Sequence, residues 1–368
     1  MRSKETVRFA DFGNTAAAED EAAVRRVLAS GQLVLGAEVR HFEDAWAKRC
    51  GVHFAVGVAN GLDAIEIGLR SLGIGPGDEV ITTPMTAVAT VLGIVRAGAI
   101  PVLADIEPST ALLSLSSVDR CVTPRTRAVL LVHLYGQMRD LSEWIAFCDS
   151  HGLLLLEDCA QSHDATHDGK AAGSWGAFGA YSFYPTKNLG AVGDGGALVT
   201  NETAVDEAAR SLRNYGQQTR YVHDRVGLNS RLDEVQAAIL SSRLGKLTDW
   251  THRRRQIAES YRAGIRSDHV ELMASPISPE NHVYHLFVVR SAHRAQLQQH
   301  LLDANVETLI HYPVPVHRQT PFQTLSADPV GLLNSDEHAA RCLSLPCRPN
   351  LSDNEVERVI EAVNSFQP

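Results

Sequence analysis

The chain has 368 residues, of which 44% are apolar, so it is long enough for about two domains and a sizeable buried site. The formal net charge of −9 is spread along the sequence without a basic block, which argues against nucleic-acid binding. No apolar run reaches the roughly 18 residues of a membrane span, and the N-terminus lacks a secretory signal, so we expect a cytoplasmic protein without membrane contact.

Short apolar strands and amphipathic helices alternate through the first part of the chain. We expect helices at 19–30, 62–72, 86–98 and 140–151, and strands at 55–59, 79–83, 101–105, 127–134, 153–158 and 196–200. This alternation predicts an α/β fold with a parallel, doubly wound sheet. In such sheets ligands bind at the carboxyl ends of the strands.

The C-terminal part has a different pattern. A long amphipathic stretch at 231–265 precedes the Ser-Pro-rich segment 275–280, and a strand-like segment at 282–290 follows. Helices are expected at 292–304 and near 353–366. We therefore predict a second, smaller domain, with an N-terminal arm and large domain at 1–250 and the smaller domain at 251–368.

Two polar residues in the first domain point to a cofactor. Asp158 ends the expected strand at 153–158, and Lys187 follows in a loop with aromatic residues and glycines. A desolvated lysine has a lowered pKa and offers a neutral amine for a Schiff base. A pyridoxal ring also needs a carboxylate that keeps its pyridine nitrogen protonated. Each residue alone is more often a solvated lysine or a turn-forming aspartate, but the pair suggests pyridoxal 5'-phosphate.

The segment NGLDA at 60–64 lies between an expected strand and an expected helix. Backbone N–H groups at the start of a helix can hold a phosphate group. Asn-Gly is also an ordinary turn sequence, so both interpretations stay open.

Together, several motifs resemble the DegT/DnrJ/EryC1/StrS family of sugar aminotransferases. They are NGLDA, GIGPGDEVITTP, HLYGQ, EDCAQSH, SFYPTKNLGAVGDGGALVTN, RNYGQ, GLNSRLDEVQAA and HYPVPVH, in this order between about residues 20 and 350. The resemblance implies the pyridoxal-phosphate-dependent fold type I, with a large domain built on a mostly parallel sheet and a smaller C-terminal α+β domain. It also implies a homodimer whose active sites are shared between subunits.

The family's site residues carry over by motif. Lys187 matches the Schiff-base lysine, Asp158 the partner of the pyridine nitrogen, and Gln161 the neighbour of the ring hydroxyl. The residues implied for the phosphate group are Gly61, Leu62, Ser182 and, from the other subunit, Asn229. The residues implied near the substrate are His163, Tyr184, Tyr312, Pro313 and His317.

The sequence departs from the family pattern at two places. Ala87 stands where members commonly have an aromatic residue that covers the cofactor ring, so what stacks on the ring is open. Asn60 and Leu62 replace a frequent serine and threonine of the phosphate loop. The NGLDA sequence at 60–64 nevertheless resembles that of family members that act on 3-keto sugars.

The resemblance implies ping-pong transamination of a nucleotide-linked keto sugar, in particular a dTDP-3-keto-6-deoxyhexose, with an amino acid such as L-glutamate as donor and pyridoxamine 5'-phosphate as the intermediate form of the cofactor. The alternatives are an aminotransferase for a keto-cyclitol or for a 4-keto nucleotide sugar, and a non-catalytic sensor that binds the cofactor.

Three other functions are disfavoured. The related deoxysugar dehydratases have histidine in place of Lys187. A nicotinamide-dependent dehydrogenase is disfavoured because GIGPGD at 73–78 follows an expected helix and precedes an expected strand. A dinucleotide-binding motif has the reverse order, with the strand before the glycines and the helix after them. No metal site is expected, because His311 and His317 have no recognised zinc spacing. The six cysteines show no C-x-x-C spacing and are expected to be reduced thiols.

Overall fold

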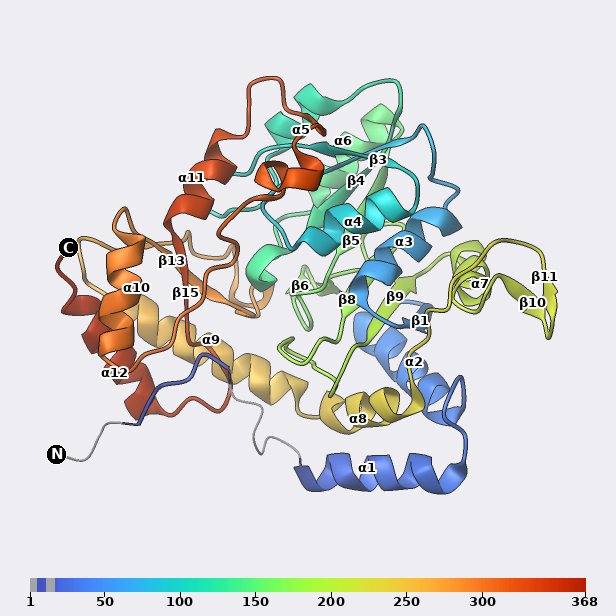
Figure 1. Cartoon of the computed structure of the whole chain (residues 1–368), viewed down its shortest axis with the longest axis horizontal. Coiled ribbons are helices and arrows are strands. Elements are labelled where there is room, and N and C mark those ends of the chain that lie inside the picture. The colour runs from blue at the N-terminus through green and yellow to red at the C-terminus, as the bar shows by residue number, and fades with distance from the viewer. Residues whose placement is uncertain (1–4, 11–16) are drawn as a thin grey trace.

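A mixed sheet of eight strands forms the centre of the large part of the molecule (Figure 1). The computed structural model describes residues 5–10 and 17–368, so the parts of the predicted N-terminal arm at 1–4 and 11–16 lie outside it. The strand order is β1-β9-β8-β5-β4-β2-β3-β14. The strands are β1 (Phe54–Val58), β2 (Glu79–Thr82), β3 (Ile100–Leu103), β4 (Thr126–Val132), β5 (Leu154–Asp158), β8 (Gly179–Ser182), β9 (Gly196–Thr200) and β14 (Ser326–Ala327).

All neighbouring strands from β8 to β14 pair in parallel, and β9 runs antiparallel to both β1 and β8. The predicted α/β class with a mostly parallel sheet is therefore confirmed. The antiparallel strand was not predicted, because the apolar pattern of a buried strand is the same in either direction.

Helices cover both faces of this sheet. The helices of this part are α1 (Ala17–Ser30), α2 (Ala37–Cys50), α3 (Gly61–Ser71), α4 (Val88–Arg96), α5 (Leu115–Cys121), α6 (Ser142–His151), α7 (Thr203–Leu212) and α8 (Glu234–Leu244). Apolar side chains of α2, α5, α6 and α8 form one buried cluster with the sheet, and those of α3, α4 and α7 form another. The two-sided cover explains why the strands read as continuous apolar runs.

A smaller antiparallel sheet and its helices lie toward the C-terminus. The strands β12 (Glu271–Leu272), β13 (Phe287–Arg290) and β15 (Cys342–Leu345) form this sheet in the order β12-β13-β15. It shares an apolar core with α9 (Leu247–Gly264), α10 (Arg294–Asp303) and α12 (Asp353–Asn364), and Val7 from the N-terminal segment is part of this core. Figure 1 shows these elements at the opposite side of the molecule from α7.

The remaining elements are short. They are η1 (Leu134–Gly136), β6 (Thr166–His167), β7 (Lys170–Ala171), β10 (Gln217–Thr219), β11 (Val222–His223), η2 (Pro279–Asn281), η3 (Val316–Arg318), η4 (Thr320–Phe322) and α11 (Leu333–Arg341). No helix in the described ranges combines the length and the apolar character that a membrane crossing requires.

Two C-terminal segments differ from the sequence expectation. The amphipathic stretch 231–265 forms two helices, α8 and α9, because the first ends at Gly245. Of the strand-like segment 282–290, only β13 pairs in the sheet. Val283 instead donates its N–H to the carbonyl of Gly136 (3.0 Å) and accepts from Asn188 Nδ2 (3.1 Å). These bonds attach the segment to loops of the large part.

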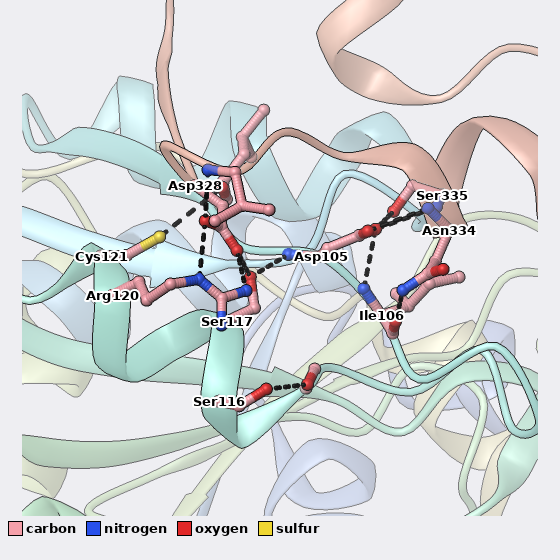
Figure 2. Close-up of polar contacts among 12 residues, drawn as sticks. Asp105, Ile106, Ser116, Ser117, Arg120, Cys121, Asp328, Asn334 and Ser335 are labelled. Carbon is pink, nitrogen blue, oxygen red and sulfur yellow. Dashed lines mark hydrogen bonds and ion pairs between the residues drawn. The ribbon is translucent and has the colours of Figure 1, made fainter.

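Buried carboxylates fasten the segment from β14 to α11 onto the edge of the large sheet (Figure 2). Asp105, two residues after the end of β3, accepts from the N–H groups of Asn334 (2.9 Å) and Ser335 (2.9 Å) at the start of α11 and from Ser335 Oγ (2.6 Å). Asp328 beside β14 accepts from Arg120 Nε (3.0 Å) and from Ser117 Oγ. A carboxylate at a helix N-terminus is stabilised by the free N–H groups and the helix dipole.

We expect Asp105→Ala to lower the free energy of unfolding by about 2–4 kcal/mol, because buried N–H donors at the start of α11 lose their acceptor. Urea unfolding followed by circular dichroism measures this change. The exposed Asp268→Ala is the control and should change stability by less than about 0.5 kcal/mol. Equal stability of both variants would mean that Asp105 does not fasten α11.

Candidate active site

Asp158 lies at the carboxyl end of β5, where the sequence predicts a ligand site. Its side chain is 6% exposed, and its carboxylate has a donor on each oxygen. Thr90 Oγ1 of α4 donates to Oδ2 (2.7 Å), and the N–H of Ala160 donates to Oδ1 (3.1 Å). Thr90 in turn shares a hydrogen bond with Thr86 (2.7 Å). The two donors fix the orientation of the carboxylate.

Lys187 is partly buried in the turn that follows β8. Its N–H donates to the carbonyl of Tyr184 (2.8 Å), and Ala191 N donates back to the carbonyl of Phe183 (2.8 Å), so the loop is a closed turn. Burial lowers the pKa of Lys187 from 10.5 to about 8, and the nearby carboxylate of Asp158 opposes part of this shift. About one tenth of the amine is therefore neutral at pH 7, far more than for a lysine with an ordinary pKa, and an attacking amine must be neutral.

Gln161 connects two tyrosines at the same edge of the sheet. Its Oε1 accepts from the backbone N–H of Tyr135 (2.6 Å), and its Nε2 donates to the hydroxyl of Tyr312 (3.1 Å). Burial, and to a smaller extent the negative charge of Asp158, raises the pKa of Tyr312 to about 12. The Tyr312 hydroxyl is therefore protonated and remains a hydrogen-bond donor near neutral pH.

The start of α3 and the end of β8 form a close backbone approach. Gly61 and Leu62 are the first residues of α3, and Asn60 caps the helix by accepting from the N–H of Asp63 (2.8 Å). A Cβ atom at Gly61 would lie 2.8 Å from the Cβ of Ser182. The helix N-terminus and the Ser182 hydroxyl thus lie together without an intervening side chain. This combination suits a phosphate group.

His163 is fully buried among aromatic rings. Its ring lies 5.8 Å from Trp46, 5.2 Å from Tyr181 and 5.6 Å from Phe183, measured between centroids. Burial and the charge of Lys187 lower the pKa of His163 to about 3, so the imidazole is neutral. Neither ring nitrogen has a hydrogen-bond partner in the described structure. His163 thus has unused hydrogen-bonding capacity close to Lys187.

Three predicted residues are not part of this group within one chain. Tyr184 is 52% exposed, and Asn229 is exposed in a loop that pairs with Asn214. His317 contacts Asp336 of α11, with 2.9 Å between Nε2 and Oδ1. Ala87 is the N-cap residue of α4, the helix that carries Thr90.

Some residues of the site were missed by the sequence analysis. Behind Asp158, the buried Glu157 pairs with His133 (2.9 Å) and accepts from the N–H groups of Gly173 (2.8 Å), Trp175 (2.9 Å) and Gly176 (2.9 Å). His133, Glu157 and Cys159 lie close enough to hold a metal ion. Since the oxygens of Glu157 already accept these N–H groups, the cluster is better explained as an anchor for the 173–176 loop.

Next to Lys187 the protein has a cavity of about 400 Å³. Neither Asp158 nor Gln161 lines it, so it adjoins the group described above and does not coincide with it. Its walls come from the lysine loop, from α8 and α9, from the end of β15 and from the N-terminal Phe9.

The sequence model of the DegT/DnrJ/EryC1/StrS aminotransferase family matches residues 14–364. The chain belongs to this family. A dTDP-3-amino-3,4,6-trideoxy-alpha-D-glucose transaminase of Streptomyces venezuelae is 44% identical over 353 residues, which cover 95% of this chain and 92% of the relative. A dTDP-3-amino-3,6-dideoxy-alpha-D-galactopyranose transaminase of Aneurinibacillus thermoaerophilus is 43% identical over 348 residues, with 95% of each chain covered.

Solved structures agree with this assignment. The crystal structure of S. venezuelae DesV in complex with a ketimine intermediate superimposes with a TM-score of 0.94 at 41% identity and covers 98% of each chain. The family recognised from the motifs, its fold and its enzyme class are thus confirmed. As a member of the DegT/DnrJ/EryC1/StrS family, the protein is a pyridoxal-phosphate-dependent aminotransferase. The lysine with a lowered pKa, the anchored Asp158 and the cradle at Gly61 and Ser182 fit this cofactor.

Proposed function

We propose that the protein transfers the amino group of an amino acid, in the first instance L-glutamate, to the C3 carbonyl of a dTDP-linked 3-keto-6-deoxyhexose. The observation that carries this proposal is the similarity, over more than nine-tenths of each chain, to two transaminases named for dTDP-3-amino sugars. The NGLDA segment at the start of α3 supports the same substrate class. The proposal includes a cytoplasmic location, which the six buried, unpaired cysteines support.

Each site residue has a role in this reaction. When bound, the cofactor supplies a carbonyl group that accepts the donor's amine and a ring that withdraws electrons from the reacting carbon. Lys187 would hold the cofactor through Nζ and, once released, would move the proton at the reacting carbon of each substrate. Asp158 would keep the pyridine nitrogen of the bound cofactor protonated, and Gln161 would contact its ring hydroxyl.

Other residues hold the phosphate group and the sugar. The N–H groups of Gly61 and Leu62 and the hydroxyl of Ser182 bind the phosphate, and we propose that Asn229 of the other subunit completes this site. The exposure of Asn229 in a single chain supports a role at a subunit interface. Tyr312 and His163 adjoin the ring-binding residues. The exposed side chain of Tyr184 and His317, which lies beside Asp336, would have to meet the substrate outside this group.

We also propose the division into a large domain at 1–250 and a smaller one at 251–368. The separate apolar core of the C-terminal elements supports it. The boundary lies in the first turn of α9. Limited proteolysis that cleaves the chain near residue 250 would agree with this division. Cleavage confined to sites elsewhere in the chain would contradict it.

A substrate panel tests the proposed function. The enzyme loaded with pyridoxamine 5'-phosphate is mixed with a dTDP-3-keto-6-deoxyhexose, a dTDP-4-keto-6-deoxyhexose or a keto-cyclitol, and the amine product is measured. The 3-keto sugar should have the largest kcat/KM. A larger value for either other substrate would replace the proposal with that alternative. If the enzyme loaded with pyridoxal 5'-phosphate has a borohydride-reducible bond but the panel gives no amine product, the protein would be a sensor.

The shared site predicts complementation between two damaged chains. A Lys187→Ala chain has no working lysine but retains Asn229, and an Asn229→Asp chain places a like charge beside its partner's phosphate, which weakens binding. In the mixed dimer, the site with intact Lys187 borrows its asparagine from the Lys187→Ala chain. One of two sites is then whole, so each heterodimer should recover about half of the native activity.

The complementation is measured after subunit exchange, with native mass spectrometry to count heterodimers. The matched control mixes Lys187→Ala with Asp158→Asn, because both changes damage the chain's own site and no heterodimer site is restored by Asn229. If heterodimers form and the first mixture stays at the activity of its parents, Asn229 does not act across the interface.

A further inference from the structure

The cavity beside Lys187 has a cationic wall. Its charged lining residues are Lys187, Arg243, Arg254 and Arg348, and none of the lining residues that the structure describes is an aspartate or glutamate. The rest of the wall is largely apolar, with Phe9, Leu286, Leu309 and Leu345 among it. Positive groups on low-dielectric walls focus the potential and favour an anionic ligand.

Two of these arginines already have acidic partners outside the cavity wall. Arg243 Nη2 lies 2.6 Å from Asp20 Oδ2, and Arg348 Nη2 lies 2.7 Å from Glu355 Oε1. These ion pairs neutralise their charges and fix their positions. Arg243 and Arg348 therefore define the shape of the cavity wall, but they add little uncompensated positive charge to it.

Arg254 differs from both, because no ion pair joins it to a carboxylate of the described residues. It is 8% exposed, and its Nη1 donates to the carbonyls of Tyr284 (3.1 Å), His285 (3.4 Å) and Cys347. Its Nε is buried and has no hydrogen-bond partner. A buried guanidinium with neutral acceptors alone is costly unless an anion compensates it.

A short path leads from Arg254 to the reacting lysine. The carbonyl of His285 accepts from Arg254, and the ring of the same histidine lies 3.2 Å from Asn188 Oδ1, measured from Nδ1. Asn188 directly follows Lys187. One residue layer therefore separates the lysine from the arginine.

We propose that this cavity binds a carboxylate of the amino-acid donor, with Arg254 as its counterion. The inference rests on the proposed function, since it assigns the donor's place in the same reaction. An amino acid fits within 400 Å³ and brings the carboxylate that Arg254 lacks.

The first test adds a charge to the cavity without touching Arg254. Leu309 lines the cavity and is 47% exposed, and its N–H and carbonyl both pair with Ser344, so its side chain can be changed without loss of these bonds. Leu309→Glu should raise KM for L-glutamate at least about tenfold relative to Leu309→Gln. KM for the nucleotide sugar should agree within twofold between the two variants.

A second readout does not depend on turnover. Succinate binds to the holoenzyme as an unreactive dicarboxylate, and its Kd is measured from the change in the visible absorption of the cofactor. Leu309→Glu should raise this Kd at least about tenfold over Leu309→Gln. Unchanged donor KM and succinate Kd would overturn the proposal. A rise confined to KM of the nucleotide sugar would overturn it too, because the cavity would then serve the diphosphate.

Arg254 is then tested directly. Arg254→Lys keeps the positive charge but loses the planar fork, and it should raise KM for L-glutamate and the succinate Kd at least about tenfold. Arg253→Lys is the matched control, since Arg253 is the neighbour on α9, pairs with Asp353 (2.6 Å) and does not line the cavity. Values for Arg254→Lys equal to those of the control would contradict the assignment.

The outcomes also separate this inference from the proposed function. If Arg254→Lys fails to fold by circular dichroism, the Leu309 pair decides the question. If the wild-type enzyme converts no keto sugar in the panel but still binds succinate in a way that Leu309→Glu abolishes, the proposed sugar reaction fails while the carboxylate site stands. If it converts the sugar and succinate binding is insensitive to both positions, only the cavity assignment fails.

Discussion

Replacing Lys187 by alanine is expected to lower kcat at least about 10⁴-fold, because one change removes both the covalent anchor of the cofactor and the group that moves the proton. The pKa of about 8 supports this dual role, since a lysine titrating at that pH can hold a proton and also release it. The measurement is kcat for the keto sugar, together with the visible band that borohydride removes from the wild-type enzyme.

The control for this prediction is Lys48→Ala, which removes an exposed lysine of α2. It should keep both the rate and the reducible band. The Lys187→Ala protein should still take up cofactor through the phosphate contacts, but borohydride should not attach that cofactor to the chain. A reducible bond and a wild-type rate in Lys187→Ala would remove the lysine from the reaction.

The parts of the site that were predicted from sequence lie within local motifs. Asp158 and Gln161 share one short segment at the end of β5, and Lys187 lies in a glycine-rich turn whose aromatic neighbours indicate burial. In each case the residues that the chemistry requires lie close together in the sequence. The order of strands and helices was also predictable, because the short apolar runs of buried strands and the 3.6-residue period of amphipathic helices are local properties of the chain.

The parts that were missed depend on contacts between distant residues. Thr90 meets Asp158 across 68 positions, and the interaction of Arg254 with the carbonyl of Cys347 spans 93 positions. Thr90 in an apolar helix and Arg254 in a run of three arginines carry no local sign of these roles. The position of His317 beside Asp336 was missed for the same reason. Only the folded chain brings such partners together.

Asp158→Asn is expected to lower kcat about 10²-fold or more, equivalent to roughly 2.7 kcal/mol of transition-state stabilisation. An amide cannot hold a proton on the pyridine nitrogen, so the ring withdraws electrons less effectively when the reacting carbon loses its proton. The measurement is kcat in each half reaction, with cofactor occupancy determined from the visible band so that weak binding is not mistaken for slow chemistry.

The structure indicates that this variant keeps its fold. The amide oxygen can still accept from the N–H of Ala160, and the amide nitrogen can donate to Thr90 Oγ1, whose own proton can turn to Thr86. Thermal unfolding of the apoprotein should therefore change little. A rate near that of the wild type would limit Asp158 to a structural role.

Thr90→Val tests whether Thr90 affects kcat by orienting the Asp158 carboxylate or by acting directly at the cofactor ring. In the wild type, loss of the 2.7 Å bond from Thr90 frees the carboxylate to turn, so kcat should fall about tenfold. In the Asp158→Asn background the same change should have little further effect, because there is no carboxylate left to orient. If the two losses multiply, Thr90 acts independently of Asp158, and the hydroxyl has a separate function at the ring.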